Sequence, residues 1–270
     1  MNNSEKKQGA LATLTVMRGE LERLPGLIES LAFSTEKHFV ETGPMSAELR
    51  DWPGLVVHHH PLPMGAPFDA ARGEALPHIK AKWVLVVDTD ERVPPSLVEH
   101  LTARLPEFES KQVQGVWIPR RNHVLSSPLL HSSAWPDYQL RLFRTEVATF
   151  SNQIHAFVPK LKCEERLAAI DSLAIRHFNF ENTSEFVTKL NVYSSIEAEQ
   201  SKDTTAPSVA RALYRACRQV AVRYLKMNGY RDGAEGLHYA LLLGVYQYLI
   251  ETKRWELKRC NTGQRESSRV

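Results

Sequence analysis

Cysteine is scarce in this chain, with only Cys163, Cys217 and Cys260 among 270 residues. The three are far apart and odd in number, so they indicate neither a disulfide framework nor a zinc-binding spacing. A reducing compartment is the simplest setting for such a chain. We therefore expect a cytoplasmic protein.

Long apolar runs are also lacking. The first eight residues are polar and no apolar core segment of the kind found in signal peptides follows them, which argues against an ordinary secretory signal. The most apolar later stretch, residues 237–250, contains His, Gln and Tyr and is too short to span a bilayer. If the protein acts on a membrane substrate, we expect it to bind from one side, at the inner face of the cytoplasmic membrane.

A large excess of one charge is the third absence. The formal net charge is only +3, which is too small to indicate nucleic-acid binding, and we expect no nucleic-acid partner. Hydrophobic residues make up 43% of the chain and charged residues 24%, so a sizeable core can form.

The first two-thirds of the chain alternates short β-type runs with amphipathic stretches. The pattern predicts strands at residues 11–17, 38–41, 55–59 and 82–87, and helices at 20–32, 68–79 and 95–105. Strands that alternate with helices indicate an α/β fold, in which a parallel sheet has helices on both faces.

The pattern changes after residue 115. Further strands are predicted at 116–118, 138–143 and 173–178, and helices at 184–200, 208–227 and 236–258. This pattern divides the chain into a catalytic domain at residues 1–200, a C-terminal helical hairpin at 201–260 and a flexible tail at 261–270.

Two carboxylates, Asp88 and Asp90, directly follow the apolar run at 82–87. Ligands of parallel sheets bind beyond the carboxyl ends of the strands. Two carboxylates at the end of a buried strand cost free energy unless a cation binds them. Mg²⁺ and Mn²⁺ take oxygen ligands of this kind. The alternative is that the acids only begin a loop and cap the helix that follows.

Arg72 lies one short predicted helix upstream of this acidic pair. Its guanidinium could hold the oxygens of a diphosphate or pair with the acids themselves. The alternative is a surface arginine on an amphipathic helix.

Residues 68–76 (FDAARGEAL) and 82–93 (KWVLVVDTDERV) resemble the family 2 glycosyltransferases, and within them the subgroup of lipopolysaccharide-core and other cell-surface glycan enzymes. Residues 135–144, 154–155, 175–178 and 228–233 resemble later family segments in the same order. The resemblance covers roughly residues 10–258, and the ordered series is more specific than any single motif.

The resemblance implies a GT-A type fold, in which a mostly parallel nucleotide-binding sheet is flanked by helices and carries a C-terminal helical extension. It implies an inverting hexosyl transfer from a nucleotide-diphosphate sugar to a glycan or lipid-linked acceptor. Asp88 and Asp90 then form the DXD motif that binds Mg²⁺ or Mn²⁺, with His155 as a further metal ligand. His177 is the other histidine that could contact the metal or a phosphate, and the alternative for both is a packed, hydrogen-bonded histidine. Asp137 takes the place of the catalytic base.

On the donor side, the resemblance implies contacts from Arg18, Glu20, Glu41, Arg72 and Asp88. The chain departs from the family pattern elsewhere: it has Ser46 for a second acid, Gly73 for a helix asparagine and Ala156 for a glutamate. These departures motivate an alternative, a catalytically weakened nucleotide-sugar or glycan-binding protein of the same fold. A nucleotidyltransferase is disfavoured, because residues 17–20 make a poor phosphate-binding loop.

The predicted C-terminal hairpin is basic and amphipathic. We favour an interpretation in which it packs on the sheet with its basic residues solvated, and weak peripheral contact with an anionic membrane is an additional expectation. The basic residues concerned are Arg211, Arg215, Arg218, Arg223 and Lys226.

The His58-His59-His60 run predicts the end of a strand rather than a metal site, since neighbouring strand residues point to opposite faces.

Overall fold

The computed structural model describes residues 11–63, 66, 68–147, 161–180 and 182–267. The chain forms two compact units, each built from two separate segments. The first comprises Met1–Arg121 and Pro136–His177, and the second comprises Asn122–Trp135 and Phe178–Val270.

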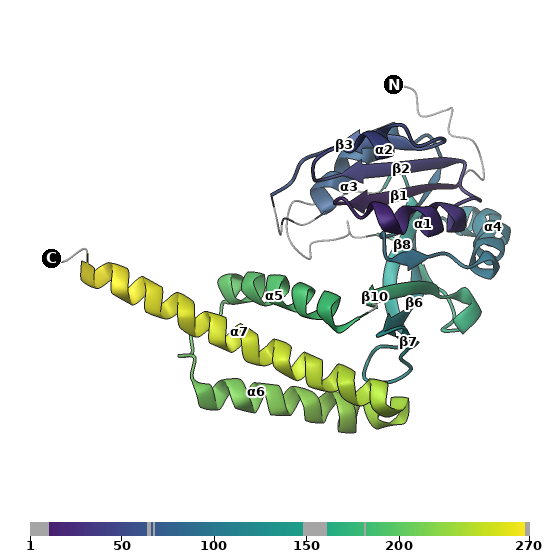
Figure 1. Cartoon of the computed structure of the whole chain (residues 1–270). Helices are drawn as coiled ribbons and strands as arrows, with labels where there is room; N and C mark the ends of the chain where they lie inside the picture. The colour runs from purple at the N-terminus through teal and green to yellow at the C-terminus, as the bar shows by residue number, and fades with distance from the viewer. Residues whose placement is uncertain (1–10, 64–65, 67, 148–160, 181, 268–270) are drawn as a thin grey trace. The chain divides into compact units, whose positions relative to one another are not determined.

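Four parallel strands begin the sheet of the first unit, in the spatial order β3-β2-β1-β4 (Figure 1). Their bounds are β1 (Leu11–Met17), β2 (Glu36–Glu41), β3 (Val56–His59) and β4 (Trp83–Val86). The parallel α/β pattern predicted from the sequence is confirmed.

Antiparallel strands extend this sheet beyond β4. β8 (Asp137–Arg144) pairs with β4 and with β6 (Gly115–Val124). The short β5 (Glu91–Arg92) pairs antiparallel with β10 (Ile175–Phe180), and β7 (Ser127–Pro128) pairs antiparallel with β6. β9 (Glu164–Arg166) also pairs with β6, but in parallel. The predicted strands at 116–118, 138–143 and 173–178 are therefore present as β6, β8 and β10. β6 ends six residues past the predicted end, and β10 begins and ends two residues later than predicted.

Side chains of the central strands alternate between two cores, one on each face of the sheet. On β4, Trp83 and Leu85 enter the core that contains α1 (Leu24–Ser30) and α4 (Pro95–Ser110), while Val84 and Val86 enter the core that contains α3 (Asp69–Ala75). The sheet is thus covered by helices on both faces, which explains why the β4 sequence is apolar throughout.

The helix α4 continues through Pro106 to Ser110, past the predicted end at residue 105. A proline inside a helix removes one backbone hydrogen bond and normally ends the helix. Here the residues after it are held by packing, since Phe108 is fully buried in the same core as Leu101 and Leu105.

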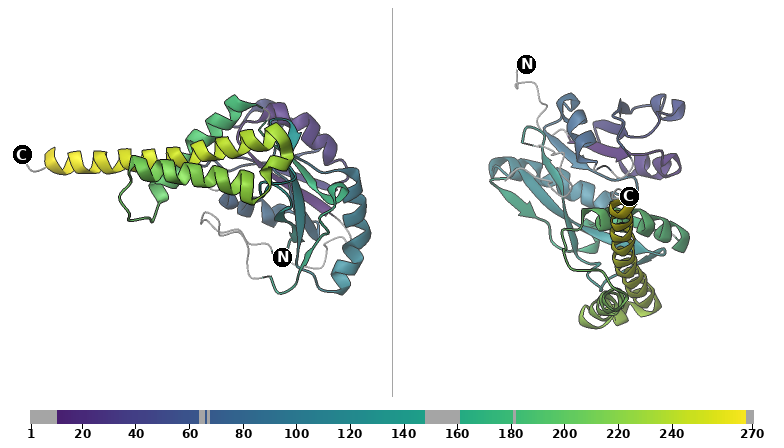
Figure 2. Two further views of the ribbon diagram at one scale, coloured as in Figure 1. Left: turned by 90° about the horizontal axis from the view of Figure 1, so that it is seen from below. Right: turned by 90° about the vertical axis from the view of Figure 1, so that its left-hand side faces the viewer.

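The second unit is dominated by three long helices, α5 (Thr183–Gln200), α6 (Val209–Ala221) and α7 (Gly233–Ser267). A turn of π-helix, Val222–Lys226, extends α6, and α6 runs alongside α7 in both views of Figure 2. All three predicted helices are present, and α7 extends beyond the predicted end at residue 258. None of the helices described is long and apolar enough to cross a membrane.

Part of the basic surface predicted for this region points inward. Arg211 and Arg215 on α6 both form ion pairs with Asp203 and with the fully buried Glu251 of α7. Arg254 joins the same cluster, 2.9 Å from Glu251. The prediction that the basic residues lie on the solvated face is wrong for Arg211 and Arg215, because two carboxylates on neighbouring segments bind them.

Candidate functional site

The carboxyl ends of β1, β2 and β4 lie at one edge of the parallel sheet. The register pairs Met17 with Glu41, so the loops after β1 and β2 start at the same level. Val86, the last residue of β4, is opposite Leu14, so the loop after β4 starts three residues before the end of β1. The predicted donor-side residues and the acidic pair belong to these loops, to the helix α3 or, for Glu41, to the last position of β2.

Glu41 joins the first two loops. Its side chain is buried, and its two carboxylate oxygens accept hydrogen bonds from the backbone N–H groups of Gly43 at 2.6 Å and Gly19 at 3.1 Å. Gly19 has a positive φ of 78°, which favours glycine at this turn. Glu20 accepts a bond from the backbone N–H of Arg18 at 2.6 Å.

Arg18 connects these loops to the segment after β3. Its guanidinium donates to the Thr42 hydroxyl at 3.3 Å and to the carbonyl oxygens of Leu62 at 2.8 Å and Pro63 at 3.0 Å. The structure thus brings together Arg18, Glu20 and Glu41, three of the residues predicted to contact the donor. Ser46 has a structural role, since its hydroxyl caps α2 (Ala47–Arg50).

Asp88 is held between two arginines. Arg72 of α3 lies 2.9 Å from Asp88 Oδ1, and Arg141 of β8 lies 2.6 Å from Asp88 Oδ2. Burial alone would raise the pKa of Asp88, but the charges of Arg141 and Arg72 outweigh it and hold that pKa well below its usual range. Asp88 is therefore a carboxylate with both oxygens bound to guanidinium groups.

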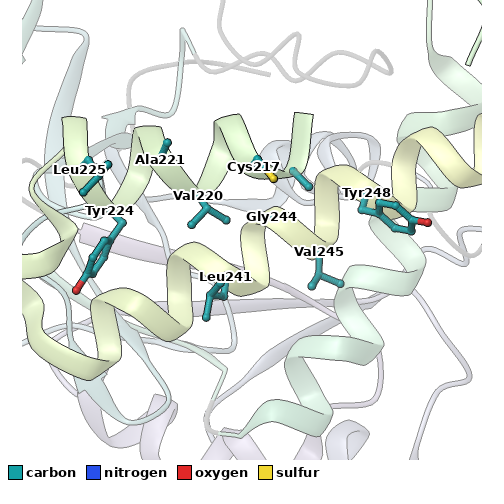
Figure 3. A pocket seen from close by; sticks show the side chains of 10 residues that line it. Cys217, Val220, Ala221, Tyr224, Leu225, Leu241, Gly244, Val245 and Tyr248 are labelled. Carbon is teal, nitrogen blue, oxygen red and sulfur yellow. The ribbon is translucent and has the colours of Figure 1, made fainter. Parts of the chain in front are cut away.

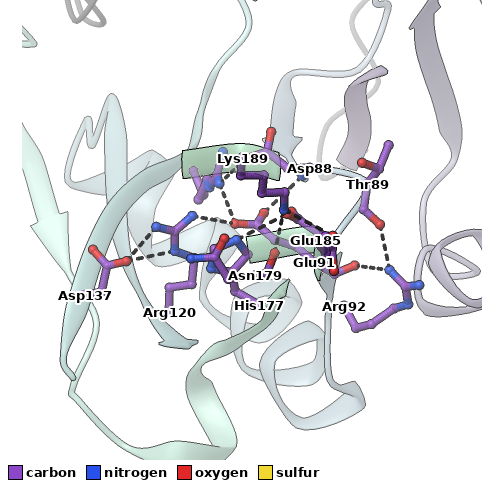
Figure 4. A network of polar contacts seen from close by, with 12 residues as sticks. Asp88, Thr89, Glu91, Arg92, Arg120, Asp137, His177, Asn179, Glu185 and Lys189 are labelled. Carbon is purple, nitrogen blue, oxygen red and sulfur yellow. Dashed lines mark hydrogen bonds and ion pairs between the residues drawn. The ribbon is translucent and has the colours of Figure 1, made fainter. Parts of the chain in front are cut away.

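The ion pairs continue from Asp88 to Asp137. Arg141 also binds Glu91 at 2.5 Å, Glu91 lies 3.3 Å from Arg120, and Arg120 binds Asp137 at 2.6 Å (Figure 4). The Glu91 side chain is 0% exposed, so these two arginines supply the partners that a buried carboxylate requires. The acidic loop and the predicted base thus belong to one network.

Asp90 lies beside β10. The pairing of Glu91 with His177 brings β5 next to β10, and His177 Nε2 lies 3.5 Å from Asp90 Oδ2. The predicted metal ligand His155 lies outside the described residues. Within the described part of the chain, no group of three or more His, Cys, Asp or Glu side chains is arranged to hold a metal ion.

The backbone of the acidic loop is fixed by Arg92. Its guanidinium donates to the carbonyl oxygens of Thr89 at 2.9 Å, Glu91 at 2.7 Å and Arg23 at 3.1 Å (Figure 4). These bonds tie the loop after β4 to the start of α1 and restrict the position of Asp90.

Sequence reasoning missed Arg120, Arg141 and Glu91. A signal for Arg141 was present, because Asp137, Gln139 and Arg141 alternate along a predicted strand and therefore share one face. Gln139 indeed donates to Asp137 at 2.8 Å. Arg120 gives no such signal, since it meets Asp137 through the pairing of β6 with β8.

No family model and no curated protein sequence matches this chain. Among solved structures, a mannosyltransferase from Pyrobaculum calidifontis, in complex with GDP-Man and Mn²⁺, superposes with a TM-score of 0.53 at 12% identity. That match covers 94% of this chain and 88% of the other. TarS of S. aureus (residues 1–349) gives a TM-score of 0.44 at 12% identity, over 93% of this chain and 92% of that one.

The architecture is that of the GT-A type: four parallel strands, helices on both faces of the sheet, added antiparallel strands and long C-terminal helices. The fold class predicted from the sequence is confirmed. At 12% identity the similarity to the mannosyltransferase concerns the fold. The side chains of the site are the basis for any reaction that this protein catalyses.

Proposed function

We propose that this protein is a glycosyltransferase that uses a nucleotide-diphosphate sugar. The observation that supports it most directly is the network at the carboxyl edge of the sheet. Arg72, Arg141 and Arg92 fix the loop of Asp88 and Asp90 beside the loops that carry Arg18 and Glu41. Ligands of parallel sheets bind at this edge.

The donor would bind across the first loops. Glu41 and Arg18 hold the loops after β1, β2 and β3 together, so they position the backbone groups around the base and ribose. Glu20 restrains Arg18 from the other side. Arg72 pairs with Asp88, and it could hold diphosphate oxygens as a bidentate donor when the donor binds.

A divalent ion, Mg²⁺ or Mn²⁺, is part of the proposal. Asp90 and His177 offer a carboxylate oxygen and an imidazole nitrogen close together, a donor set that fits such an ion, whereas both oxygens of Asp88 accept from arginines. When bound, the ion would neutralise charge that develops on the departing diphosphate. The mannosyltransferase from Pyrobaculum calidifontis, in complex with GDP-Man and Mn²⁺, supports this choice.

The transfer would invert the anomeric centre, with Asp137 as base. Asp137 accepts the proton of an acceptor hydroxyl while that oxygen forms a bond to the anomeric carbon, and the bond from this carbon to the diphosphate breaks. Arg120 holds Asp137 Oδ2 with two bonds, at 2.6 and 2.9 Å, and Gln139 holds Oδ1. Arg120 therefore orients the carboxylate, and Gln139 has to give way for Oδ1 to receive the proton.

The resemblance to family 2 enzymes of lipopolysaccharide-core synthesis favours a hexosyl group and a cell-surface glycan or lipid-linked acceptor. The sugar transfer would then take place in the cytoplasm, at the inner face of the cytoplasmic membrane.

A second candidate is a sugar-nucleotide-binding protein that has lost catalysis. The observation that favours it is the tight pairing of Asp137 with Arg120, together with the use of Ser46 as a helix cap. Turnover of any nucleotide sugar, even hydrolysis, would exclude it.

The deciding experiment is a thermal-shift screen of nucleoside diphosphates and nucleotide sugars, with and without Mn²⁺, followed by assays for released nucleoside diphosphate. A ligand of the folded state raises the melting temperature according to its concentration relative to its Kd. We expect an Mn²⁺-dependent shift that disappears in Asp90→Asn and persists in Asp51→Asn, which changes an exposed carboxylate directly after α2. Equal shifts in both variants would contradict the proposed metal site.

A further inference from the structure

The second unit carries an apolar groove between α6 and α7. It encloses about 570 Å³, and Figure 3 shows Tyr224 and Tyr248 at its opposite ends, with Val220 and Leu241 between them. Its walls carry almost no polar surface. The lining residues are Ala216, Cys217, Val220, Ala221, Tyr224, Leu225, Leu241, Gly244, Val245 and Tyr248.

Large side chains beside this groove are exposed to an unusual degree. On α6 and its π-helical extension, Leu213 is 52% exposed, Tyr214 66% and Leu225 62%, and on α7 Leu241 is 47% and Val245 50% exposed. Residues 213, 217, 221 and 225 recur every four positions, so they form one stripe along the helix. A contiguous apolar surface of this kind marks an interaction site.

The polarity of α6 is reversed relative to an ordinary surface helix. Arg211 and Arg215 turn toward α7 and its buried Glu251, while Leu213 and Tyr214 turn outward. If water covered the outer side, arginines would be favoured there and apolar side chains would be favoured inside. The outer face of this hairpin is therefore suited to an apolar environment.

The charges around the groove favour an anionic surface as the binding partner. Residues 209–226 include five basic residues and no acidic one, and residues 236–250 include neither Asp, Glu, Lys nor Arg. Arg218 and Lys226 are exposed on α6 and its extension. A second copy of this chain would bring like charges together with no carboxylate on the face to pair with them, whereas an anionic surface would complement them.

We infer that this face binds an anionic lipid membrane. Leu213, Leu225, Leu241 and Val245 enter the boundary between headgroups and acyl chains, and the tyrosine rings lie at the interface with their hydroxyl groups in the headgroup layer. Arg218 and Lys226 contact lipid phosphates. This inference goes beyond the proposed transferase activity. It predicts which face of the protein contacts the membrane, and it does not depend on the identity of the sugar donor.

The test is co-sedimentation of the full chain with phosphatidylcholine vesicles that contain or lack phosphatidylglycerol. We expect binding to the anionic vesicles that weakens as salt is raised. Arg218→Gln and Lys226→Gln should each lower the affinity about fivefold, the value for one basic residue at an anionic surface. Lys202→Gln, an exposed lysine in the segment between α5 and α6, should have no effect.

The apolar contribution is tested separately. The double variant Leu213→Gln, Leu225→Gln should reduce vesicle binding more than tenfold. The matched control, Val187→Gln with Val192→Gln, replaces exposed valines of α5 and should not. Circular dichroism and thermal unfolding confirm that each variant is folded. Since no nucleotide sugar is present, failure here leaves the transferase proposal untouched.

Cys217 in the groove allows a direct measurement of insertion. In a chain with Cys163→Ser and Cys260→Ser, an environment-sensitive dye on Cys217 should shift to the blue with anionic vesicles and be quenched by bromine-labelled acyl chains. Absence of vesicle binding, or binding unaffected by the Leu213 and Leu225 changes, would overturn the inference. So would a concentration-dependent dimer that those changes dissociate.

Discussion

Arg141 of β8 places one guanidinium nitrogen, Nη2, 2.6 Å from the Oδ2 atom of Asp88. The same nitrogen lies 2.5 Å from Glu91, so a single arginine neutralises two carboxylates of the acidic loop. In this structure the loop of the proposed metal site is held by a residue from a strand more than 50 positions later in the chain.

The first prediction concerns the stability that Arg141 provides. Arg141→Leu should destabilise the protein by about 3–5 kcal/mol, because it leaves the buried Glu91 with the longer contact to Arg120 and the backbone N–H of Asp88, but without its closest cation. Urea unfolding measures the change. Arg50→Leu, at an exposed position of α2, is the control and should change stability by less than about 0.5 kcal/mol. A small effect of Arg141→Leu would mean that water reaches Glu91.

The second prediction separates catalysis from donor binding. Asp137→Asn should reduce sugar transfer at least a hundredfold, since the amide cannot accept the proton of the acceptor hydroxyl. Donor affinity, followed by thermal shift, should stay the same. The control is Asp171→Asn, an acid of the same unit that pairs with Arg121 away from this network. Unchanged transfer in Asp137→Asn would require another base.

The third prediction concerns acid sensitivity at the edge of the sheet. His58 stacks between His38 and His78, with ring centroids 5.3 and 5.1 Å away, and His38 Nδ1 lies 3.0 Å from His58 Nε2. Burial, and then the charges of His38 and His78, lower the pKa of His58 from 6.5 to about 4. The folded state therefore takes up this proton less readily than the unfolded state.

It follows that His58 adds no pH dependence above pH 6.5. The free energy of unfolding should fall as the pH drops from 6.5 toward 4, with a slope of up to about 1.4 kcal/mol per pH unit for one proton. His58→Gln should flatten this part of the profile, and His238→Gln, an exposed histidine of α7, should leave it unchanged. Identical profiles for the wild type and His58→Gln would disprove the assignment.

The fourth prediction concerns two glycines of α7. A methyl group on Gly236 would lie 2.0 Å from the carbonyl oxygen of Gly229, whereas one on Gly244 would lie 2.6 Å from the side chain of Val220. Both changes to alanine gain about 1 kcal/mol of helix propensity. Gly236→Ala should nevertheless cost about 1–3 kcal/mol through backbone displacement. Gly244→Ala should cost less, because its closest contact is a side chain and the nearest backbone atom, the Ala216 oxygen, is 3.2 Å away. Comparative urea unfolding of the two variants tests this order.

The parallel half of the fold could be predicted from the sequence because its signals are local. Apolar β-type runs at 11–17 and 82–87, separated by amphipathic helices, indicate an α/β sheet and place Asp88 and Asp90 at its carboxyl edge. The same reasoning failed at Pro106, where burial of Phe108 outweighs the cost of a proline inside a helix.

The arginine network could not be predicted in the same way. Arg120 and Asp137 meet through the pairing of two antiparallel strands, and Glu91 meets Arg141 across a long separation in sequence. Contacts of this kind depend on register and on the closure of long loops, which periodicity does not encode. Likewise, Arg211 and Arg215 have the pattern of solvated residues, and only the position of Glu251 explains why they turn inward.

The second unit contains a short segment, Asn122–Trp135, that the ribosome releases long before the helices it packs with. Leu129 of this segment is fully buried in a cluster with Phe186 and Leu190, and Ser132 bonds to Met227 and Arg223. A chain shortened after residue 177 would therefore leave the segment Asn122–Trp135 without the helices that bury it. A shortened form of the protein should therefore keep the C-terminal helices. During synthesis, the segment Asn122–Trp135 can pack only after about a hundred further residues have been made.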